Sequence, residues 1–145
     1  MINDKPISDN WNILIIDDNE DIHTITKNAF FDEVINGKQI SFLSAYTEKE
    51  ALTFLKEFHQ DIVVLILDLV LGDNGAEGCT IINYINKELH NSRLQIILRT
   101  GYYKKQEVKK IELNYPQVLI LEKGETDVDM LIQIVTDKIN IYINQ

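Results

Sequence analysis

Five short runs of apolar residues are spread along the chain and are separated by longer segments of mixed polarity. Four of the runs are almost unbroken in isoleucine, leucine and valine, which is typical of parallel strands covered on both faces of a sheet. The fifth run contains the polar Ser41 and is predicted to be an edge strand. The predicted strands are Ile13–Ile16, Ile40–Leu43 (the edge), Ile62–Leu67, Leu94–Leu98 and Val118–Leu121.

The segments between these runs carry apolar residues at helical spacing. Gly37 is placed to stop the first helix or the turn after it. Thr47 and Glu50 have the spacing of a capping box at the start of the second helix. The residues that mark the five helices are Ile22, Ile25, Thr26, Ala29 and Phe30; Ala51, Leu52, Leu55 and Phe58; Ile82, Ile85 and Leu89; Val108 and Ile111; and Val128, Leu131, Ile132, Val135, Ile139 and Tyr142.

The regular alternation of strands and helices predicts an α/β fold. Right-handed crossovers then give a doubly wound, flavodoxin-like sheet of five parallel strands in the order 2-1-3-4-5, with five flanking helices. The first ten residues are polar and are expected to form a flexible leader, so that residues 11–145 make up a single domain.

Composition and charge narrow the classes of function. The net charge of −9 argues against binding of nucleic acid or of an anionic membrane through this domain. Cys79 is the only cysteine, so an intramolecular disulfide and a thiolate metal cluster are both excluded. The longest strongly apolar run, Ile62–Leu67, has the length of a strand and not of a membrane span. A soluble cytoplasmic protein is expected.

Polar residues with the chemistry of a phosphoryl-transfer site follow four of the predicted strands. Asp17 and Asp18 follow the first strand, Asp68 the third, Thr100 the fourth and Lys123 the fifth. Each has an ordinary explanation by itself, as a helix cap, a turn residue or a solvated side chain. Because these four strands are neighbours in the predicted order and end at one edge of the sheet, the residues are expected to converge.

Such a cluster favours a divalent cation. Three neighbouring carboxylates repel one another unless a cation neutralises them, and Mg²⁺ prefers oxygen ligands. An aspartate carboxylate can accept a phosphoryl group, and most of the catalysis is positioning and charge neutralisation. In this hypothesis Asp68 attacks phosphorus, Lys123 supplies a positive charge to a phosphoryl oxygen, and Thr100 supplies a hydroxyl donor.

Four segments resemble the response-regulator receiver family of two-component signalling. They are I-L-I-I-D-D-N-E-D, V-V-L-I-L-D-L-V-L-G, I-I-L-R-T-G and L-I-L-E-K, and the similarity extends from about Trp11 to Tyr142. The fourth-strand motif, I-I-L-R-T-G-Y, and the long first connection more narrowly resemble receivers found in front of cyclic-dinucleotide signalling domains.

The resemblance implies a role for each residue of the cluster. Asp68 is then the phosphoacceptor and a metal ligand. Asp18 binds Mg²⁺ directly, Asp17 binds it largely through water, and Val70 contributes its backbone carbonyl. Thr100 is the switch hydroxyl, and Lys123 binds the phosphoryl group. Apart from its own phosphorylation and dephosphorylation, the chain is not expected to be an enzyme.

The resemblance also implies partners. The phosphoryl group is expected to come from a histidine kinase, a phosphotransfer protein or a small phospho-donor, and the signal is expected to reach a downstream protein or output domain. Recognition falls on the fourth helix, the fifth strand and the fifth helix, where Met130, Ile134 and Ile141 form a second apolar face that could support a homodimer. The basic segment from Tyr103 to Lys110 is either a solvated helix face or part of that docking surface.

Three positions depart from the receiver pattern. Gly124 stands where the family has a proline after the lysine, and Ile120 replaces the aromatic residue that normally moves on phosphorylation. The loop after Asp68 is longer than usual and lacks its proline. These changes bear on the output mechanism more than on phosphorylation.

Two alternatives remain open. A degenerate receiver would bind a partner without being phosphorylated, and the changes at Gly124 and Ile120 keep this hypothesis alive. A phosphatase with an aspartyl intermediate would need a second acid two residues after Asp68, where the chain has Val70.

Overall fold

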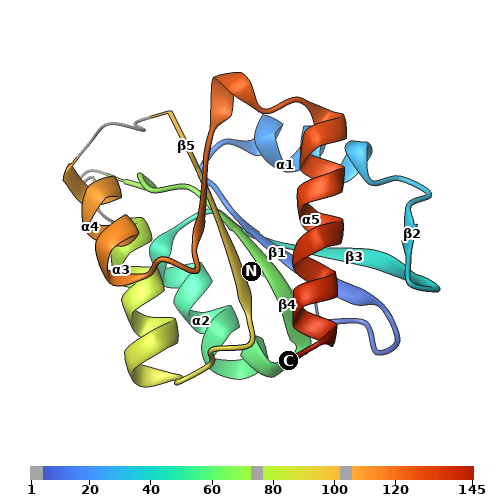
Figure 1. The fold of residues 1–145 in the computed structure, drawn as a ribbon, viewed down its shortest axis with the longest axis horizontal. Helices are drawn as coiled ribbons and strands as arrows, with labels where there is room; N and C mark the ends of the chain where they lie inside the picture. The colour runs from blue at the N-terminus through green and yellow to red at the C-terminus, as the bar shows by residue number, and fades with distance from the viewer. Residues whose placement is uncertain (1–4, 73–76, 102–105) are drawn as a thin grey trace.

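The computed structural model describes residues 5–72, 77–101 and 106–145 of the chain. A central sheet is covered by helices on both faces (Figure 1). The strands are β1 (Trp11–Ile16), β2 (Val34–Ile35), β3 (Lys38–Ala45), β4 (Ile62–Leu67), β5 (Gln95–Thr100) and β6 (Leu119–Glu122).

The sheet has the order β2-β3-β1-β4-β5-β6, and the pairs β3–β1, β1–β4, β4–β5 and β5–β6 are all parallel. Its five parallel strands therefore have the predicted order 2-1-3-4-5. The apolar runs of β1 and β4 are buried along their whole length, as expected for strands with helices on both sides.

The edge of the sheet differs from the prediction. The strand predicted as the edge, Ile40–Leu43, is the middle of the longer β3, and the outermost strand is the two-residue β2, which pairs with β3 in the antiparallel sense. Asn36 and Gly37 connect β2 to β3 and have φ values of 48° and 79°. Both residues tolerate this left-handed region, and Asn-Gly favours a tight hairpin. Gly37 therefore serves the hairpin and does not stop the first helix.

The described helices agree with the predicted ones in number and order. A π-helical turn, Tyr84–Glu88, continues the third helix, and 3-10 turns lie at His59–Asp61 and Lys123–Glu125. None of the helices in the described ranges is long and apolar enough to cross a membrane. The helices are α1 (Glu20–Ala29), α2 (Glu48–Phe58), α3 (Glu77–Asn83), α4 (Gln106–Asn114) and α5 (Val128–Ile143).

Side-chain caps define the helix starts close to the sheet. The Thr47 hydroxyl accepts a hydrogen bond from the Glu50 amide at 3.1 Å, which confirms half of the predicted capping box. The Glu50 carboxylate accepts from the amide of Tyr46, one residue before the cap, at 2.8 Å. The first bond satisfies an amide that the first turn of the helix leaves without a partner, and the second ties the residue before the cap to that turn.

Two apolar cores lie on opposite faces of the sheet. The first core joins β1, β3, β4 and β5 to α2, α3 and α4, and the second joins the other face of the sheet to α1 and α5. Figure 1 shows the same division, with α2, α3 and α4 on one side of the sheet and α1 and α5 on the other. One predicted core residue of the first helix is wrong, because Ile25 is exposed. Thr26 and Phe30 of the same predicted set are buried, and His23 is buried beside them.

Candidate functional site

Acidic residues meet at the carboxyl end of the parallel strands. Asp17 directly follows β1 and Asp68 directly follows β4, and both side chains are buried. Asp18 is exposed, but one oxygen from each of Asp17, Asp18 and Asp68 lies within 4.8 Å of the others. The predicted convergence of these three carboxylates is therefore observed. It follows from parallel strands ending at one edge of the sheet.

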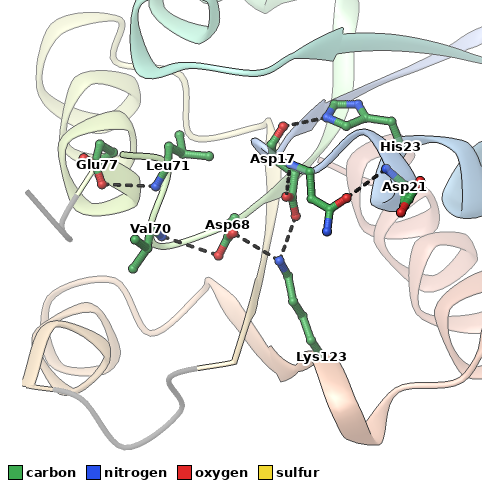
Figure 2. A network of polar contacts seen from close by, with 9 residues as sticks. Asp17, Asp21, His23, Asp68, Val70, Leu71, Glu77 and Lys123 are labelled. Carbon is green, nitrogen blue, oxygen red and sulfur yellow. Dashed lines mark hydrogen bonds and ion pairs between the residues drawn. The ribbon is translucent and has the colours of Figure 1, made fainter. Parts of the chain in front are cut away.

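A single lysine bridges the two buried carboxylates. Lys123 directly follows β6, and its Nζ lies 2.9 Å from Asp17 Oδ2 and 3.1 Å from Asp68 Oδ2. Figure 2 shows the lysine side chain rising from its loop to a point between the two acids. Because the lysine is half-buried, these ion pairs are shielded from water and stronger than surface pairs.

The loop after Asp68 is held firmly at its start. The Asp68 amide donates to the Ile16 carbonyl at 2.9 Å, and the Val70 amide donates to Asp68 Oδ1 at 3.4 Å. The buried Glu77 carboxylate accepts from the Leu71 amide at 3.1 Å. The role of the Val70 backbone carbonyl as a metal ligand stays a prediction.

A glycine lets α3 approach this loop closely. A Cβ atom on Gly78 would lie 2.8 Å from the Leu69 Cα and 2.9 Å from the Asp68 carbonyl oxygen. The Gly78 amide also donates to the Leu69 carbonyl at 2.8 Å. Only a residue without a side chain fits here, so Gly78 helps to fix where Asp68 sits.

Strand β5 contributes two polar residues. Thr100 was predicted to follow the fourth strand, but β5 is longer than predicted and Thr100 is its last residue. Its side chain is fully buried. Arg99 precedes it and is half-buried, and its Nε has no hydrogen-bond partner among the described residues. Burial lowers the pKa of the Arg99 guanidinium, and the charges of Asp17 and Asp68 partly oppose that shift. The sequence reasoning missed Arg99, although a charged residue inside an apolar strand was a visible signal.

For both Asp68 and Lys123, burial shifts the pKa in one direction and the opposite charge of the ion-pair partner shifts it in the other. Burial raises the pKa of Asp68, the nearby Asp17 adds to this effect, and Lys123 lowers the pKa without cancelling the rise. Burial alone would lower the pKa of Lys123, but its contacts with Asp17 and Asp68 outweigh it and raise that pKa. The single ammonium group thus does not fully compensate for the buried negative charge, and a further cation would stabilise the ionised form of Asp68.

The donor set fits Mg²⁺. The three clustered groups offer only carboxylate oxygens, the ligand type that Mg²⁺ prefers, and two of the groups are buried. Their formal charge of −3 is only partly balanced by Lys123. A divalent cation between Asp17, Asp18 and Asp68 would therefore satisfy both the ligand chemistry and the charge.

Some residues that the sequence interpretation used lie outside the described ranges. They are Asp73, Asn74 and Gly75 in the loop after Asp68, Tyr102, the Tyr103–Lys105 part of the basic segment, and residues 1–4 of the predicted leader. Ile120 is described and pairs with Leu98 across β5 and β6, which places it on the same face of the sheet as Thr100.

No family model matches the chain. Solved structures that resemble it are receiver domains. A CheY-like response regulator receiver domain protein from Methanospirillum hungatei superposes with a TM-score of 0.73 at 21% identity, over 93% of this chain and 98% of that one. The signal receiver domain of an HD domain-containing protein from Pseudomonas fluorescens has the same TM-score at 17% identity, covering 94% and 99% of the two chains.

A third similar structure is the CheX–CheY–BeF₃–Mg²⁺ complex from Borrelia burgdorferi. It has a TM-score of 0.67 at 22% identity and covers 88% of this chain and 87% of that one. The chain has the fold of a CheY-like response-regulator receiver domain, which confirms at the level of fold the resemblance seen in the sequence motifs.

The curated relative is a much longer protein. The 3′3′-cGAMP-specific phosphodiesterase 2 of Vibrio cholerae is 31% identical over 91 residues, which is 63% of this chain. The matched region spans 17% of that relative's length. The similarity fits the narrower expectation from the I-I-L-R-T-G-Y motif, a receiver of the type found with cyclic-dinucleotide signalling domains.

Proposed function

We propose that this chain is a phosphorylation switch that accepts a phosphoryl group on Asp68. The observation that carries the proposal is the buried Asp68 carboxylate, with Lys123 at 3.1 Å and two more carboxylates within 4.8 Å. The receiver fold supports such a switch in general, because this fold is used in two-component signalling. The chain's own residues supply the more specific argument.

The proposed transfer is a displacement at phosphorus. A carboxylate oxygen of Asp68 forms the new bond to phosphorus, the bond to the donor's leaving group breaks, and the leaving group departs with the electron pair. Val70 holds Asp68 Oδ1 through its amide, while Lys123 contacts Oδ2. The Lys123 ammonium group can contact a phosphoryl oxygen as negative charge develops there, and its contact with Asp17 limits how far it can move.

Asp17, Asp18 and Asp68 would hold Mg²⁺, with the Val70 carbonyl as a further ligand. Bound there, the cation would neutralise the acids and the phosphoryl oxygens during transfer. The side chains on both sides of it are already held: Asp17 by Lys123, and Asp68 by Lys123 and Val70. Ordered ligands lower the cost of forming the metal site.

Thr100 is the proposed link to the output surface. It is the last residue of β5, and its side chain is buried. A phosphoryl group on Asp68 would offer new acceptor oxygens to this hydroxyl and shift the balance between two arrangements of the domain. Ile120 cannot perform the ring movement of an aromatic residue, so the shift is expected to pass through packing of the α4, β6 and α5 surface.

Intact-mass analysis tests the proposal. Wild type, Asp68→Asn and Asp61→Asn are incubated with acetyl phosphate and Mg²⁺. Asp61 is a matched control, since it is an exposed aspartate at the opposite end of β4. Wild type and Asp61→Asn are expected to gain one phosphoryl group and Asp68→Asn none, and EDTA is expected to prevent the reaction. Equal labelling of Asp68→Asn, or no labelling of wild type, would contradict the proposal.

Absence of labelling in a folded wild type that still binds Mg²⁺ would favour the alternative of a phosphorylation-independent interaction module.

The proposed switch also implies a phosphoryl donor and a recipient of the signal. The donor is a histidine kinase, a phosphotransfer protein or a small phospho-donor, and the recipient is a downstream protein or output domain. In this proposal the domain comprises residues 11–145, acts in the cytoplasm, and catalyses only its own phosphorylation and dephosphorylation.

A further inference from the structure

A histidine lies directly behind the acidic site. His23 of α1 is 1% exposed, and its ring is wedged between the β1–α1 connection and β3. Its Nε2 is 2.7 Å from the backbone carbonyl oxygen of Asp17, and its Nδ1 is 2.8 Å from the Ser44 hydroxyl. Figure 2 shows the ring on the far side of Asp17 from Lys123.

The partners of the ring assign its hydrogen atoms. A backbone carbonyl oxygen can only accept, so Nε2 carries the proton and donates to Asp17. In the neutral ring Nδ1 is then an acceptor, and the Ser44 hydroxyl donates to it. The Asp17 carbonyl thus sets the tautomer, and the Ser44 hydroxyl, which can donate or accept, adapts to it and holds the other side of the ring, in the way that outer-sphere partners orient the ligands of metal sites.

The ring is also held against movement. The His23 ring stacks on Tyr46 with centroids 4.2 Å apart, and Ser44 is itself buried in β3. Two hydrogen bonds and a ring contact therefore fix both the position and the rotation of the imidazole. Such an arrangement can define the direction of the Asp17 carbonyl to within a narrow range.

The direction of that carbonyl matters because the peptide unit between Asp17 and Asp18 is planar. Fixing the carbonyl fixes the plane, and with it the point from which the Asp18 side chain starts. Two further contacts hold the same turn: the Asp17 amide donates to the Ala45 carbonyl at 3.1 Å, and the Asn19 amide donates to Asp17 Oδ1 at 2.9 Å. Among the described residues, His23 is the one that donates to the carbonyl that leads to Asp18.

We propose that His23 is a positioning residue for the divalent-cation site. By holding the Asp17 carbonyl, it turns the Asp17 and Asp18 carboxylates toward Asp68 before the metal arrives. It contacts neither the metal nor the phosphoryl group. This inference rests on the proposed function, since it assigns the Mg²⁺ ligands to this cluster.

Calorimetric titration of the full chain with Mg²⁺, beside its thermal unfolding, tests the inference. His23→Phe keeps the ring volume and removes both hydrogen bonds, and it is expected to weaken Mg²⁺ binding by about 10- to 100-fold. His23→Gln keeps a donor near the position of Nε2 and is expected to restore binding to within about threefold of wild type, since loss of an outer-sphere partner is what costs affinity. Ser44→Ala, which removes the hydrogen bond to Nδ1 and leaves the ring less firmly held, is expected to fall between the two.

A stability control separates positioning from simple destabilisation. Phe54→Leu removes packing in the core under α2, away from the acidic site, and is expected to lower the melting temperature while leaving the Mg²⁺ affinity unchanged. Wild-type affinity in His23→Phe would overturn the inference while the proposed function stands, and equal weakening in Phe54→Leu would overturn it as well. If His23→Phe does not fold, wild-type affinity in Ser44→Ala together with failure of His23→Gln to bind would overturn it. Failure of wild type to bind Mg²⁺ would overturn both proposals.

Discussion

At the scale of single residues, the acidic site is built at the expense of stability. Asp68 is buried beside Asp17, and burial raises its pKa even though Lys123 lies within 3.1 Å. Sites that must bind a charged group later often hold unfavourable charge beforehand. The burial and the neighbouring Asp17 charge that prepare Asp68 for a cation therefore destabilise the metal-free fold.

The pH dependence of stability follows from the direction of this shift. A carboxyl group whose pKa is higher in the folded state binds its proton more readily there. Its contribution to stability is therefore lost as the pH rises from the ordinary value of 3.8 through the raised folded value, and it stays lost at neutral pH. Asp68→Asn is accordingly expected to melt at a higher temperature than wild type at pH 7 without Mg²⁺. The difference should shrink as the pH falls toward 3.8.

Mg²⁺ should reverse this ranking. At a concentration 100 times its dissociation constant, a ligand specific for the folded state stabilises it by about 2.7 kcal/mol. Wild type is expected to gain this stability and Asp68→Asn to gain less, as measured by calorimetry with and without the ion. The exposed Asp61→Asn is the control. A wild type that is more stable than Asp68→Asn in metal-free buffer at pH 7 would show that the Lys123 ion pairs outweigh burial.

At the scale of elements, two glycines in turns differ in whether the backbone conformation requires glycine. Gly37 has a φ of 79° in the β2–β3 hairpin, a conformation that side chains of L-residues disfavour. Gly124 lies in the 3-10 turn after β6, is not among the glycines of positive φ, and a Cβ atom there would meet nothing within 4 Å. The first position requires glycine, whereas the second tolerates a side chain.

Alanine substitutions at the two positions are expected to have opposite effects. Gly37→Ala should destabilise the fold by about 1 to 2 kcal/mol because of the left-handed backbone. Gly124→Ala should stabilise it by about 0.4 to 1 kcal/mol, since it reduces the freedom of the unfolded chain. The midpoints of urea unfolding at constant slope measure both effects. Destabilisation by Gly124→Ala would mean that the turn after Lys123 needs the freedom of glycine.

At the scale of the whole molecule, α5 has an apolar surface that the domain itself leaves open. Leu131, Val135 and Ile139 face the core, whereas Met130 and Ile141 are 47% and 43% exposed. The predicted second face of this helix is thus exposed in part, while Ile134 packs against the core. Exposed apolar residues beside the proposed output region suit contact with another protein surface, including a second copy of the chain.

Light scattering after size-exclusion chromatography tests association through this surface. Phosphorylated wild type is expected to associate more tightly than the unphosphorylated protein. Ile141→Asp should weaken that association by at least tenfold, which corresponds to about 1.4 kcal/mol, without preventing phosphorylation. Ile25→Asp is the matched control, because it places the same charge on an exposed isoleucine of α1. Equal weakening by both variants, or a monomer in both states, would contradict the homodimer.

Much of this architecture could be predicted because local burial leaves a direct pattern in the sequence. Strands covered on both faces must be apolar throughout, so β1 and β4 were recognisable as unbroken runs. Helical spacing located all five helices, but it could not select among nearby faces. Ile25 therefore looked like a core residue, although its side chain is exposed. The two-residue β2 was too short for a pattern, although Asn36 and Gly37 carried a hairpin signal.

The sequence by itself determined which residues end the parallel strands. Because such strands end at one edge, it also determined that Asp17, Asp18, Asp68 and Lys123 would meet. Only the tertiary structure decided how they meet: which carboxylates are buried, that one ammonium group bridges two of them, and that His23 holds the turn from behind. These features depend on distances between segments far apart in the chain. No local pattern of residues encodes such distances, because they are set by how the helices and the sheet pack together.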